Sequence, residues 1–394
     1  MSGRQAPSIL ISGWRFIPHS YAVVSQFECL ELLRRGPAVR LFFEDVPFFN
    51  PSWQPMTGMY SAEEDAALRS IPPPPGDLRA DAELRCGYPC DLLRPARAER
   101  TIVFGTAELL CVPRSNVAGG VDIHEAQRRN DFTILTCSNW SKEGFVRGGV
   151  PAERVAVLPL GFDPELFRPP TPEQRARARD EMGFAPDDFV FYHAGAMTPN
   201  KGLAFLLPAF ARLALERPNA RLLLKGMDAL FPSKHLFEEQ LGNLEAQAAQ
   251  AAMSRLRYIG GQLSFADMAR IYEAADCYIS PYLAEAFNMP VLEAAACGLP
   301  VICTGGGSTD DFVAEDFALQ IASVRHPLIV DGAPEAMGLL PDLEHLVHLM
   351  LCVIDDAEFR ESARLAGPKY VGKRFTWAKV VDRLLPFLLA GRLD

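Results

Sequence analysis

Short apolar runs alternate with longer amphipathic stretches along most of the chain. We predict buried strands at Pro7 to Ser12 and Ala38 to Glu44, and a helix between them at Tyr21 to Arg35, where apolar residues recur at roughly helical spacing. A strand, a loop, a helix and a second strand in this order are typical of a doubly wound α/β sheet. The loop at 13–20 leaves the carboxyl end of the first strand, where such sheets bind their ligands.

The alternation continues to the end of the chain with one interruption. Residues 46–100 are rich in proline and aromatic residues, which predicts an irregular insertion that is ordered in part by Phe48, Phe49 and Trp53. Further buried strands are predicted at 101–104, 132–136, 155–159, 189–193, 221–225, 256–259, 276–280 and 300–303. Helices are predicted after Thr171, which with Gln174 forms a capping-box pattern, and at 202–216, 234–255, 265–275, 290–297 and 375–389.

The chain is long enough for two domains. Its 394 residues exceed what one ordinary hydrophobic core accommodates. Two successive series of strands and helices, joined near Pro169, predict an α/β protein of two Rossmann-like, doubly wound parallel-sheet domains that face a cleft. We place the N-terminal domain at 1–168, the C-terminal domain at 169–374 and a last amphipathic helix in 375–394.

Composition and charge narrow the possible functions. The formal net charge of −10 argues against a general nucleic-acid binder, because such proteins need a dense basic surface to displace counterions. The nine cysteines lack the spacing of a zinc site, so we expect no metal centre. Neither a signal peptide nor a membrane-spanning segment is evident, and we expect a cytoplasmic protein, with contact at the inner face of the membrane left open.

Two carboxylates flank a predicted helix start in the segment from Ser280 to Ile302. Pro290 suits the first turn of a helix and Asn288 is a good capping residue, so we expect the helix to begin near 289 and to end near 297. Glu285 then lies in the loop before the helix, and Glu293 lies one turn inside it.

This arrangement suits a phosphorylated ligand. The unpaired N–H groups of Phe287, Asn288 and Met289 point outward at the positive end of the helix dipole, where they can bind a phosphate. Glu293 can accept hydrogen bonds from a vicinal diol such as a ribose. The spacing alone fits equally well a Glu293 that only favours the helix N-terminus and a Glu285 that is a solvated loop charge.

The sequence EAFNMPVLEAAACGLPVI at 285–302 resembles the retaining nucleotide-sugar glycosyltransferases of sequence family 4, the glycosyl transferases group 1, which have the two-domain GT-B fold. The resemblance implies that Glu285 approaches the donor sugar, that Glu293 binds the ribose and that the amides between them hold the diphosphate. Asn288 stands where the commonest family version has glycine, and asparagine also accepts unusual backbone angles. The motif RFTW at 374–377 fits the family as well, in which the last helix crosses back to the first domain.

The segment GAMTPNKG at 195–202 follows a predicted strand and precedes a helix. In the family this position has an arginine with a lysine five residues later, and both cations bind the diphosphate. Here Ala196 replaces the arginine and Lys201 is kept, so the resemblance implies only one of the two cations that bind the diphosphate. Lys225, at the end of the next strand, is the nearest substitute for the missing cation, although a lone lysine at a strand end is otherwise a solvated surface charge.

Two further segments are expected on the donor side. Residues 258–282 resemble the family's nucleotide-base segment, which implies that Ile259, Gln262 and Leu263 flank the base. The glycine-rich segment TGGGSTDDF at 304–312 follows a strand, and we expect Gly306 to permit close approach of the backbone to the ligand.

The acceptor side has fewer matching residues. Residues 136–169 resemble the segment that ends the first family domain, where Asp163 either faces the cleft or caps the following turn. The family often has a histidine after the fourth strand, and this chain has Thr106 and Glu108 there. His19 in the first loop is our candidate for the missing contact, with His124 as a further option.

We expect the acceptor to bind against the loop at 13–20 and the aromatic insertion that contains Trp53. Both segments leave the carboxyl ends of the first two predicted strands. Exposed aromatic side chains at such a place can stack on sugar rings or on apolar aglycones.

The resemblance implies transfer of a hexose-like group from a nucleoside diphosphate sugar to an acceptor hydroxyl, with retention of the anomeric configuration, in the biosynthesis of a bacterial glycan, glycolipid or glycoconjugate. Glu285, Lys201 and His19 are the expected catalytic residues. No cofactor is expected, because the sugar nucleotide is a co-substrate. No metal is expected, because the donor loop has no convincing Asp-x-Asp motif and GT-B enzymes commonly do without one. The departing diphosphate can take the acceptor proton, so no second carboxylate is needed as a nucleophile. The expected partners are this donor and a glycan, lipid-linked or peptide acceptor. The rival hypotheses are a non-catalytic nucleotide-sugar binding or scaffold protein and a related GT-B phosphorylase or epimerase.

Overall fold

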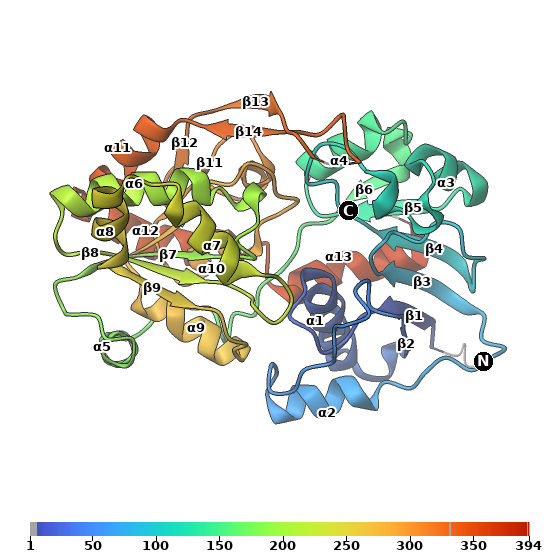
Figure 1. Ribbon diagram of the computed structural model, residues 1–394. Coiled ribbons are helices and arrows are strands. Elements are labelled where there is room, and N and C mark those ends of the chain that lie inside the picture. Colours follow the sequence, from blue (N-terminus) through green and yellow to red (C-terminus); the bar gives the residue numbers. More distant parts are fainter. Residues whose placement is uncertain (1–5, 331, 392, 394) are drawn as a thin grey trace. The chain divides into compact units, whose positions relative to one another are not determined.

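The computed structural model describes residues 6–330, 332–391 and 393 (Figure 1). The described residues form two compact units. Unit 1 comprises those up to Gly161 together with Leu328–Ala336 and those from Phe375 onward, and unit 2 comprises Phe162–Pro327 and Met337–Arg374. None of the helices in the described part of the chain combines the length and the apolar character needed to cross a membrane.

Unit 1 contains a six-stranded parallel sheet in the order β2-β1-β3-β4-β5-β6. The strand order reverses between β1 and β3, as in doubly wound sheets. The strands are β1 (Ser8–Gly13), β2 (Arg40–Asp45), β3 (Ala80–Cys86), β4 (Ala98–Phe104), β5 (Thr133–Thr136) and β6 (Val155–Val157). The α-helices are α1 (Ser20–Arg34), α2 (Ala62–Ser70), α3 (Ile123–Asn130), α4 (Asn139–Arg147) and α13 (Trp377–Ala390).

The segment predicted to be an irregular insertion contains regular structure. Residues 46–100 include α2 and β3, and β3 lies in the middle of the sheet between β1 and β4. The prediction was wrong because β3 has the sequence ADAELRC, in which Glu83 and Arg85 interrupt the apolar run that identifies a buried strand. Both charged residues are nevertheless buried.

A network of hydrogen bonds and ion pairs makes this burial possible. Glu83 accepts hydrogen bonds from Arg85 (3.0 Å), Arg94 (3.3 Å) and Thr101 (3.3 Å). Arg85 also donates to three backbone carbonyl groups of the segment that links β3 to β4, those of Asp91, Arg94 and Pro95. A buried charge is tolerated only when it is paired and hydrogen-bonded. The network therefore holds this connection, which has no helix, on the sheet.

Helix α13 packs in unit 1 through an aromatic contact. The ring of Trp377 stacks on Phe27 of α1 with a centroid separation of 5.5 Å. Gly161 leaves room for Trp377, since a Cβ atom at 161 would lie 2.6 Å from the indole ring. An ion pair of 2.6 Å between Arg35 and Asp382 adds a second contact between α1 and α13.

Unit 2 contains a second six-stranded parallel sheet, in the order β12-β11-β10-β7-β8-β9. Its strands are β7 (Phe189–Ala194), β8 (Ala220–Lys225), β9 (Leu256–Ile259), β10 (Cys277–Ser280), β11 (Val301–Thr304) and β12 (Ala318–Ile321), and β13 (Ser323–Pro327) pairs with β14 (Met337–Pro341) in a separate antiparallel hairpin. The helices are α5 (Pro172–Glu181), α6 (Leu203–Glu216), α7 (Ser233–Gly242), α8 (Ala246–Met253), α9 (Phe265–Ala274), α10 (Met289–Ala296), α11 (Leu343–Asp355) and α12 (Ala357–Gly372).

The two parallel sheets confirm the predicted Rossmann-like architecture. In unit 2 the predicted strands are present from β7 to β11, and the capping box of Thr171 and Gln174 forms at the start of α5. The helix predicted at 234–255 is two helices, α7 and α8, because the chain breaks at 243–245. The strand order of unit 2 reverses between β7 and β10, and ligands of such sheets bind at the carboxyl ends of the strands at this point.

We expect Glu83→Gln to destabilise unit 1 by about 3 kcal/mol or more, because the substitution leaves the buried Arg85 without its carboxylate. Urea unfolding followed by tryptophan fluorescence measures this, since all four tryptophans (Trp14, Trp53, Trp140 and Trp377) belong to unit 1. Glu125→Gln is the matched control. It breaks an exposed pair with Arg129 on α3 and should cost at most about 0.5 kcal/mol. Equal stability losses in the two variants would contradict the role given to the network.

Candidate functional site

Two loops leave the sheet of unit 2 where its strand order reverses. Residues 195–202 connect β7 to α6, and residues 281–288 connect β10 to α10. Asn200 joins them, since its side-chain amide donates to the carbonyl of Ala284 (3.0 Å) and its own carbonyl accepts from the amide of Leu283 (2.8 Å). The two loops therefore form one surface at the carboxyl ends of β7 and β10.

Gly202 is required where the loops meet. Its φ angle is 79°, in the left-handed region that favours glycine. A Cβ atom at 202 would lie 1.8 Å from the carbonyl oxygen of Pro281. Any other side chain would thus separate the two loops.

Lys201 and Glu285 form an ion pair between these loops. The Lys201 Nζ atom lies 2.5 Å from Glu285 Oε1, and the two side chains are 19% and 11% exposed. Glu285 is therefore not a solvated loop charge. The pair places one cation and one carboxylate side by side at the point where the strand order reverses.

Helix α10 begins at Met289, as predicted, and Cys297 is its C-cap. Asn288 occupies the N-cap position, as predicted, but its side chain makes no capping hydrogen bond to the helix. Asn288 has a φ angle of 74°, and its side-chain amide donates instead to Ser280 Oγ (2.9 Å). The amide groups of Phe287, Asn288 and Met289 have no acceptor among the described residues, so they remain available to an anion.

Glu293 lies further along α10, where it is half-buried. Its Oε2 atom accepts a hydrogen bond of 2.6 Å from the hydroxyl of Tyr272 on α9. Burial raises the pKa of Glu293 to about 7, and the hydrogen bond from Tyr272 opposes this rise. The sequence did not indicate Tyr272, because only the packing of α9 against the sheet brings it to Glu293.

Lys225 is buried at the end of β8 and is not the solvated surface charge that its position in the sequence allowed. Its ammonium group donates to the carbonyl of Gly226. Burial lowers the pKa of Lys225 to about 8, and the nearby Asp228 opposes this shift. The amide of Gly195 donates to the Lys225 carbonyl (3.0 Å), so Lys225 borders the loop that contains Lys201.

The remaining residues predicted for the donor follow neighbouring strands. Ile259 and Leu263 are half-buried and Gln262 is exposed, and all three lie at or after the end of β9. The amide of Gly306, in the loop after β11, donates to Asp310 (3.0 Å). The predicted donor residues thus follow the carboxyl ends of five adjacent strands, β9, β8, β7, β10 and β11.

Tyr258 and Asp228 connect the loops after β8 and β9. The Tyr258 hydroxyl donates to Asp228 Oδ1 (2.6 Å), and the Asp228 amide donates to the carbonyl of Gly260 (3.0 Å). A Cβ atom at 260 would lie 1.7 Å from the Asp228 carboxylate. Glycine at 260 therefore keeps these two loops together.

His19 caps α1 in unit 1. Its Nδ1 atom accepts from the Tyr21 amide (3.3 Å), and its ring packs against Trp14 and Trp53. Trp53 is only 9% exposed, so it belongs to this aromatic cluster and offers little surface for stacking on a ligand. The exposed aromatic residue of the segment is Phe49, which is 52% exposed and lies edge-on to Tyr88 with centroids 4.9 Å apart.

The other acceptor candidates are held by neighbouring groups. Thr106 Oγ1 lies 3.2 Å from the Tyr21 hydroxyl, and the Glu108 carbonyl accepts from the Trp140 indole (2.8 Å). Asp163 belongs to unit 2. Its carboxylate accepts a hydrogen bond from the Glu165 amide (2.8 Å), so Asp163 caps the following turn, which is one of the two roles considered for it. The described residues contain no group of three or more His, Cys, Asp and Glu side chains arranged to hold a metal ion.

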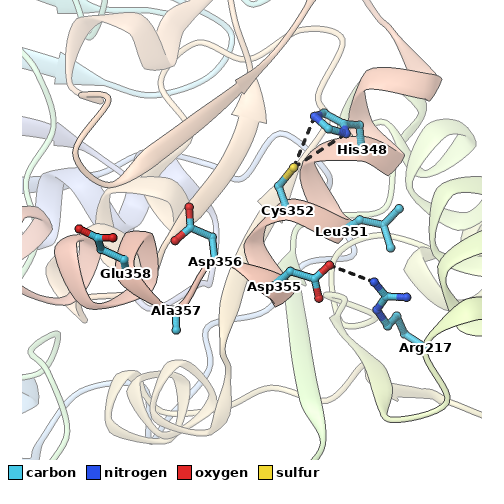
Figure 2. A pocket seen from close by; sticks show the side chains of 8 residues that line it. All are labelled: Arg217, His348, Leu351, Cys352, Asp355, Asp356, Ala357 and Glu358. Carbon is cyan, nitrogen blue, oxygen red and sulfur yellow. Dashed lines mark hydrogen bonds and ion pairs between the residues drawn. The ribbon is translucent and has the colours of Figure 1, made fainter.

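A shallow hollow of about 670 Å³ lies elsewhere in unit 2 (Figure 2). It lies at the C-terminal end of α6, just before β8 begins. This is the side of the sheet where the strands start, opposite the loops described above. Its cation, Arg217, is paired with Asp355 at 3.0 Å, and Cys352 Sγ lies 3.4 Å from His348 Nε2. Three carboxylates and one paired arginine do not suit a diphosphate. The lining residues are Arg217, His348, Leu351, Cys352, Asp355, Asp356, Ala357 and Glu358.

Comparison with known families and proteins gives a consistent result. The family model for glycosyl transferases group 1 matches residues 174–326. The chain is 28% identical over 239 residues to the GDP-mannose-dependent monoacylated alpha-(1-6)-phosphatidylinositol monomannoside mannosyltransferase of Corynebacterium glutamicum, a match that covers 59% of this chain and 55% of that protein. It is 32% identical over 185 residues to the lipopolysaccharide 1,2-N-acetylglucosaminetransferase of Salmonella typhimurium, which covers 47% of each. The chain spans about half the length of the curated relatives it matches.

Solved structures share the fold over nearly the whole chain. Alr3699/HepE of Anabaena, in complex with UDP and glucose, matches with a TM-score of 0.69 at 16% identity and covers 97% of this chain and 99% of that one. WaaG, a glycosyltransferase involved in lipopolysaccharide biosynthesis, matches with a TM-score of 0.62 at 14% identity, over 97% and 100% of the two chains. At these identities the likeness concerns the fold, which is GT-B.

Proposed function

The chain belongs to the glycosyl transferases group 1 family, and from this premise we propose that it is a retaining glycosyltransferase. It transfers a hexose-like group from a nucleoside diphosphate sugar to an acceptor hydroxyl, in the biosynthesis of a bacterial glycolipid, lipopolysaccharide or related glycan. The acceptor class follows the names of the relatives, which act on a phosphatidylinositol monomannoside and on lipopolysaccharide. Its proposed location is the cytoplasm, where it meets a lipid-linked acceptor at the membrane surface.

The ion pair of Lys201 and Glu285 carries the proposal. It lies where the strand order of the sheet reverses, in the loop next to the unpaired amides at 287–289. A diphosphate bound to these amides forms an ion pair with the Lys201 ammonium in place of Glu285. The Glu285 carboxylate can then accept a hydrogen bond from a sugar hydroxyl. Charge that develops on the leaving diphosphate is stabilised by groups that are already in place.

Lys225 supplies the second cation of this proposed site. The position that bears arginine in the family has Ala196, and Lys225 borders the same loop from the neighbouring strand. Because its pKa is lowered to about 8, Lys225 is charged at neutral pH and loses its charge above about pH 8. A bound diphosphate favours the charged form and would raise this pKa.

On the acceptor side we propose the carboxyl ends of the strands of unit 1. Phe49 and Tyr88 follow β2 and β3, and His19 follows β1. His19 accepts a hydrogen bond from the Tyr21 amide through Nδ1, so a neutral His19 carries its proton on Nε2.

A thermal-shift screen of UDP, GDP, ADP and their sugars tests the function. A ligand that binds only the folded state raises the melting temperature, so we expect one nucleoside diphosphate series to stabilise the protein. Release of that diphosphate from its sugar, by transfer or by slow hydrolysis, distinguishes an enzyme from a non-catalytic binding protein. A phosphorylase would instead require free phosphate. Absence of any nucleotide-dependent shift would contradict the proposal.

The double variant Lys201→Met/Glu285→Gln separates the folding role of the ion pair from its role in transfer. We expect Lys201→Met alone to lower both stability and transfer, because it leaves the buried Glu285 carboxylate without its cation. The double variant should recover stability to within about 1 kcal/mol of the parent, because no unpaired charge remains. Transfer should stay at least about 100-fold below that of the parent. Circular dichroism and donor turnover measure the two effects, and recovery of transfer in the double variant would exclude Lys201 as a ligand of the diphosphate.

Phe49→Ala tests the acceptor surface. We expect a several-fold loss of transfer with unchanged donor hydrolysis and unchanged melting temperature, because the side chain is 52% exposed and contributes little to the core. Trp53→Ala would be uninformative, since removal of a buried tryptophan destabilises the fold. Val146→Ala, at a 38% exposed apolar position of unit 1, is the control. A parallel loss of transfer and donor hydrolysis would place Phe49 outside the acceptor site.

A further inference from the structure

The hydroxyl of Tyr272 is held rigidly beside Glu293. The tyrosine is fully buried, and its ring packs edge-on against Phe167 and Tyr192 with centroids 5.6 Å and 4.9 Å away. The hydroxyl lies 2.6 Å from Glu293 Oε2 and 3.4 Å from the carbonyl of Pro290, in the first turn of α10. Because a tyrosine has one proton to donate, the shorter contact takes it. Glu293 is thus bound at one defined oxygen.

The second oxygen of Glu293 is available. Its Oε1 atom has no hydrogen-bond partner in the part of the chain that the structure describes, and it is not fully enclosed. A vicinal diol donates two hydrogen bonds and therefore needs an ionised carboxylate. A protonated carboxyl group would present a donor in place of one acceptor.

We propose that Tyr272 is a positioning residue for nucleotide recognition: its hydroxyl orients Glu293 and favours its ionised form, so that Oε1 can receive the ribose diol of a nucleoside diphosphate. The inference rests on the proposed function, because it takes the ligand of this site to be a nucleotide. Tyr272 does not touch the ligand. It acts through Glu293, and its contribution is greatest where Glu293 is close to protonation.

Burial and the hydrogen bond act on Glu293 in opposite directions. Burial favours the neutral acid and raises the pKa of Glu293 to about 7, whereas the Tyr272 hydroxyl stabilises the carboxylate. In the parent protein the ionised fraction of Glu293 falls as the pH drops below about 7. Without the hydroxyl, the pKa of Glu293 rises further, and the carboxylate is lost at a higher pH.

Other titratable groups around Glu293 stay protonated in this pH range. Tyr192 of β7, Tyr278 of β10 and Cys297 of α10 are buried, and burial raises the pKa of each well above its usual value. Helix α12 packs on α10 through Gly367, where a Cβ atom would lie 2.6 Å from the Ala295 carbonyl, so the close contact carries no charge.

Two further carboxylates lie near the site. Glu285 is paired with Lys201 in the preceding loop, and Glu273 lies at the end of α9 beside Tyr272. Burial raises the pKa of Glu273, while Arg270 and Arg168 lower it. A substitution at Glu293 is therefore needed to show whether Glu293, rather than Glu285 or Glu273, causes a pH dependence of nucleotide affinity.

Nucleotide affinity measured from pH 5.5 to 8.5 tests the inference. The probe is whichever of UDP, GDP and ADP stabilises the parent protein, and calorimetry gives its dissociation constant. We expect the parent to lose affinity below about pH 7. Tyr272→Phe should lose affinity at a pH higher by about one to two units, which corresponds to one hydrogen bond to a charged group. Its affinity should therefore fall below that of the parent at neutral pH and approach it only toward the upper end of the range. Ionisation of the nucleotide phosphate is common to all variants and cancels in the comparison.

Two matched variants complete the experiment. Tyr192→Phe removes another buried hydroxyl of the same cluster, one that makes no hydrogen bond to Glu293, so its inflection should stay at that of the parent. Glu293→Gln keeps the shape of the side chain and removes its charge, so the inflection near pH 7 should disappear. This second variant tests the inference even if Tyr272→Phe fails to fold, because an inflection that persists in Glu293→Gln overturns it.

The possible failures are distinguishable. If the parent binds no nucleotide at any pH, the proposed function is wrong. If the parent binds and Tyr272→Phe has the same inflection, the function stands and the inference is overturned. A uniform loss of affinity at every pH with an unchanged inflection would show a purely structural role for Tyr272 and would also overturn it.

Discussion

The arrangement of the candidate site depends on the contact between the loops after β7 and β10. These strands are neighbours only because the strand order of the sheet reverses between them, so the loops meet although 84 positions separate Lys201 from Glu285. The ion pair, the hydrogen bonds of Asn200 and the missing side chain at Gly202 each require the same close approach. Opposite charges are thereby held together at the carboxyl ends of these two central strands, next to unpaired amide groups at the start of α10.

Buried ionisable groups in the two units have different surroundings. In unit 1, Glu83 accepts several hydrogen bonds and the guanidinium group of Arg85 is largely occupied, so these charges stabilise one conformation of the β3–β4 connection. In unit 2, Glu293 is bound at one oxygen, and the ammonium group of Lys225 contacts a carbonyl group. The pKa values of these two residues are displaced toward neutrality by burial. Incompletely neutralised groups of this kind are typical of sites that bind a charged ligand.

Much of the fold followed from the sequence. Strands β7 to β11 and helices α6, α9 and α10 were predicted, because buried parallel strands are short apolar runs and the helices between them have helical periodicity. Strand β3 was missed, since a buried ion pair in a strand has the polar pattern of a loop. Strands β12 to β14 and helices α11 and α12 were not identified at all, and the predicted helix at 234–255 proved to be two.

The sequence by itself determined which residues follow each strand, and therefore which side chains are candidates for the site. Only the tertiary structure decided their state. It paired Lys201 with Glu285, buried Lys225 and Trp53, directed the Asn288 side chain to Ser280, and brought Tyr272 to Glu293. The physical reason is that burial and hydrogen bonding depend on neighbours that lie far apart in the sequence. A linear pattern fixes the order of the groups along the chain, whereas the packing of strands and helices sets their exposure, their partners and their charge.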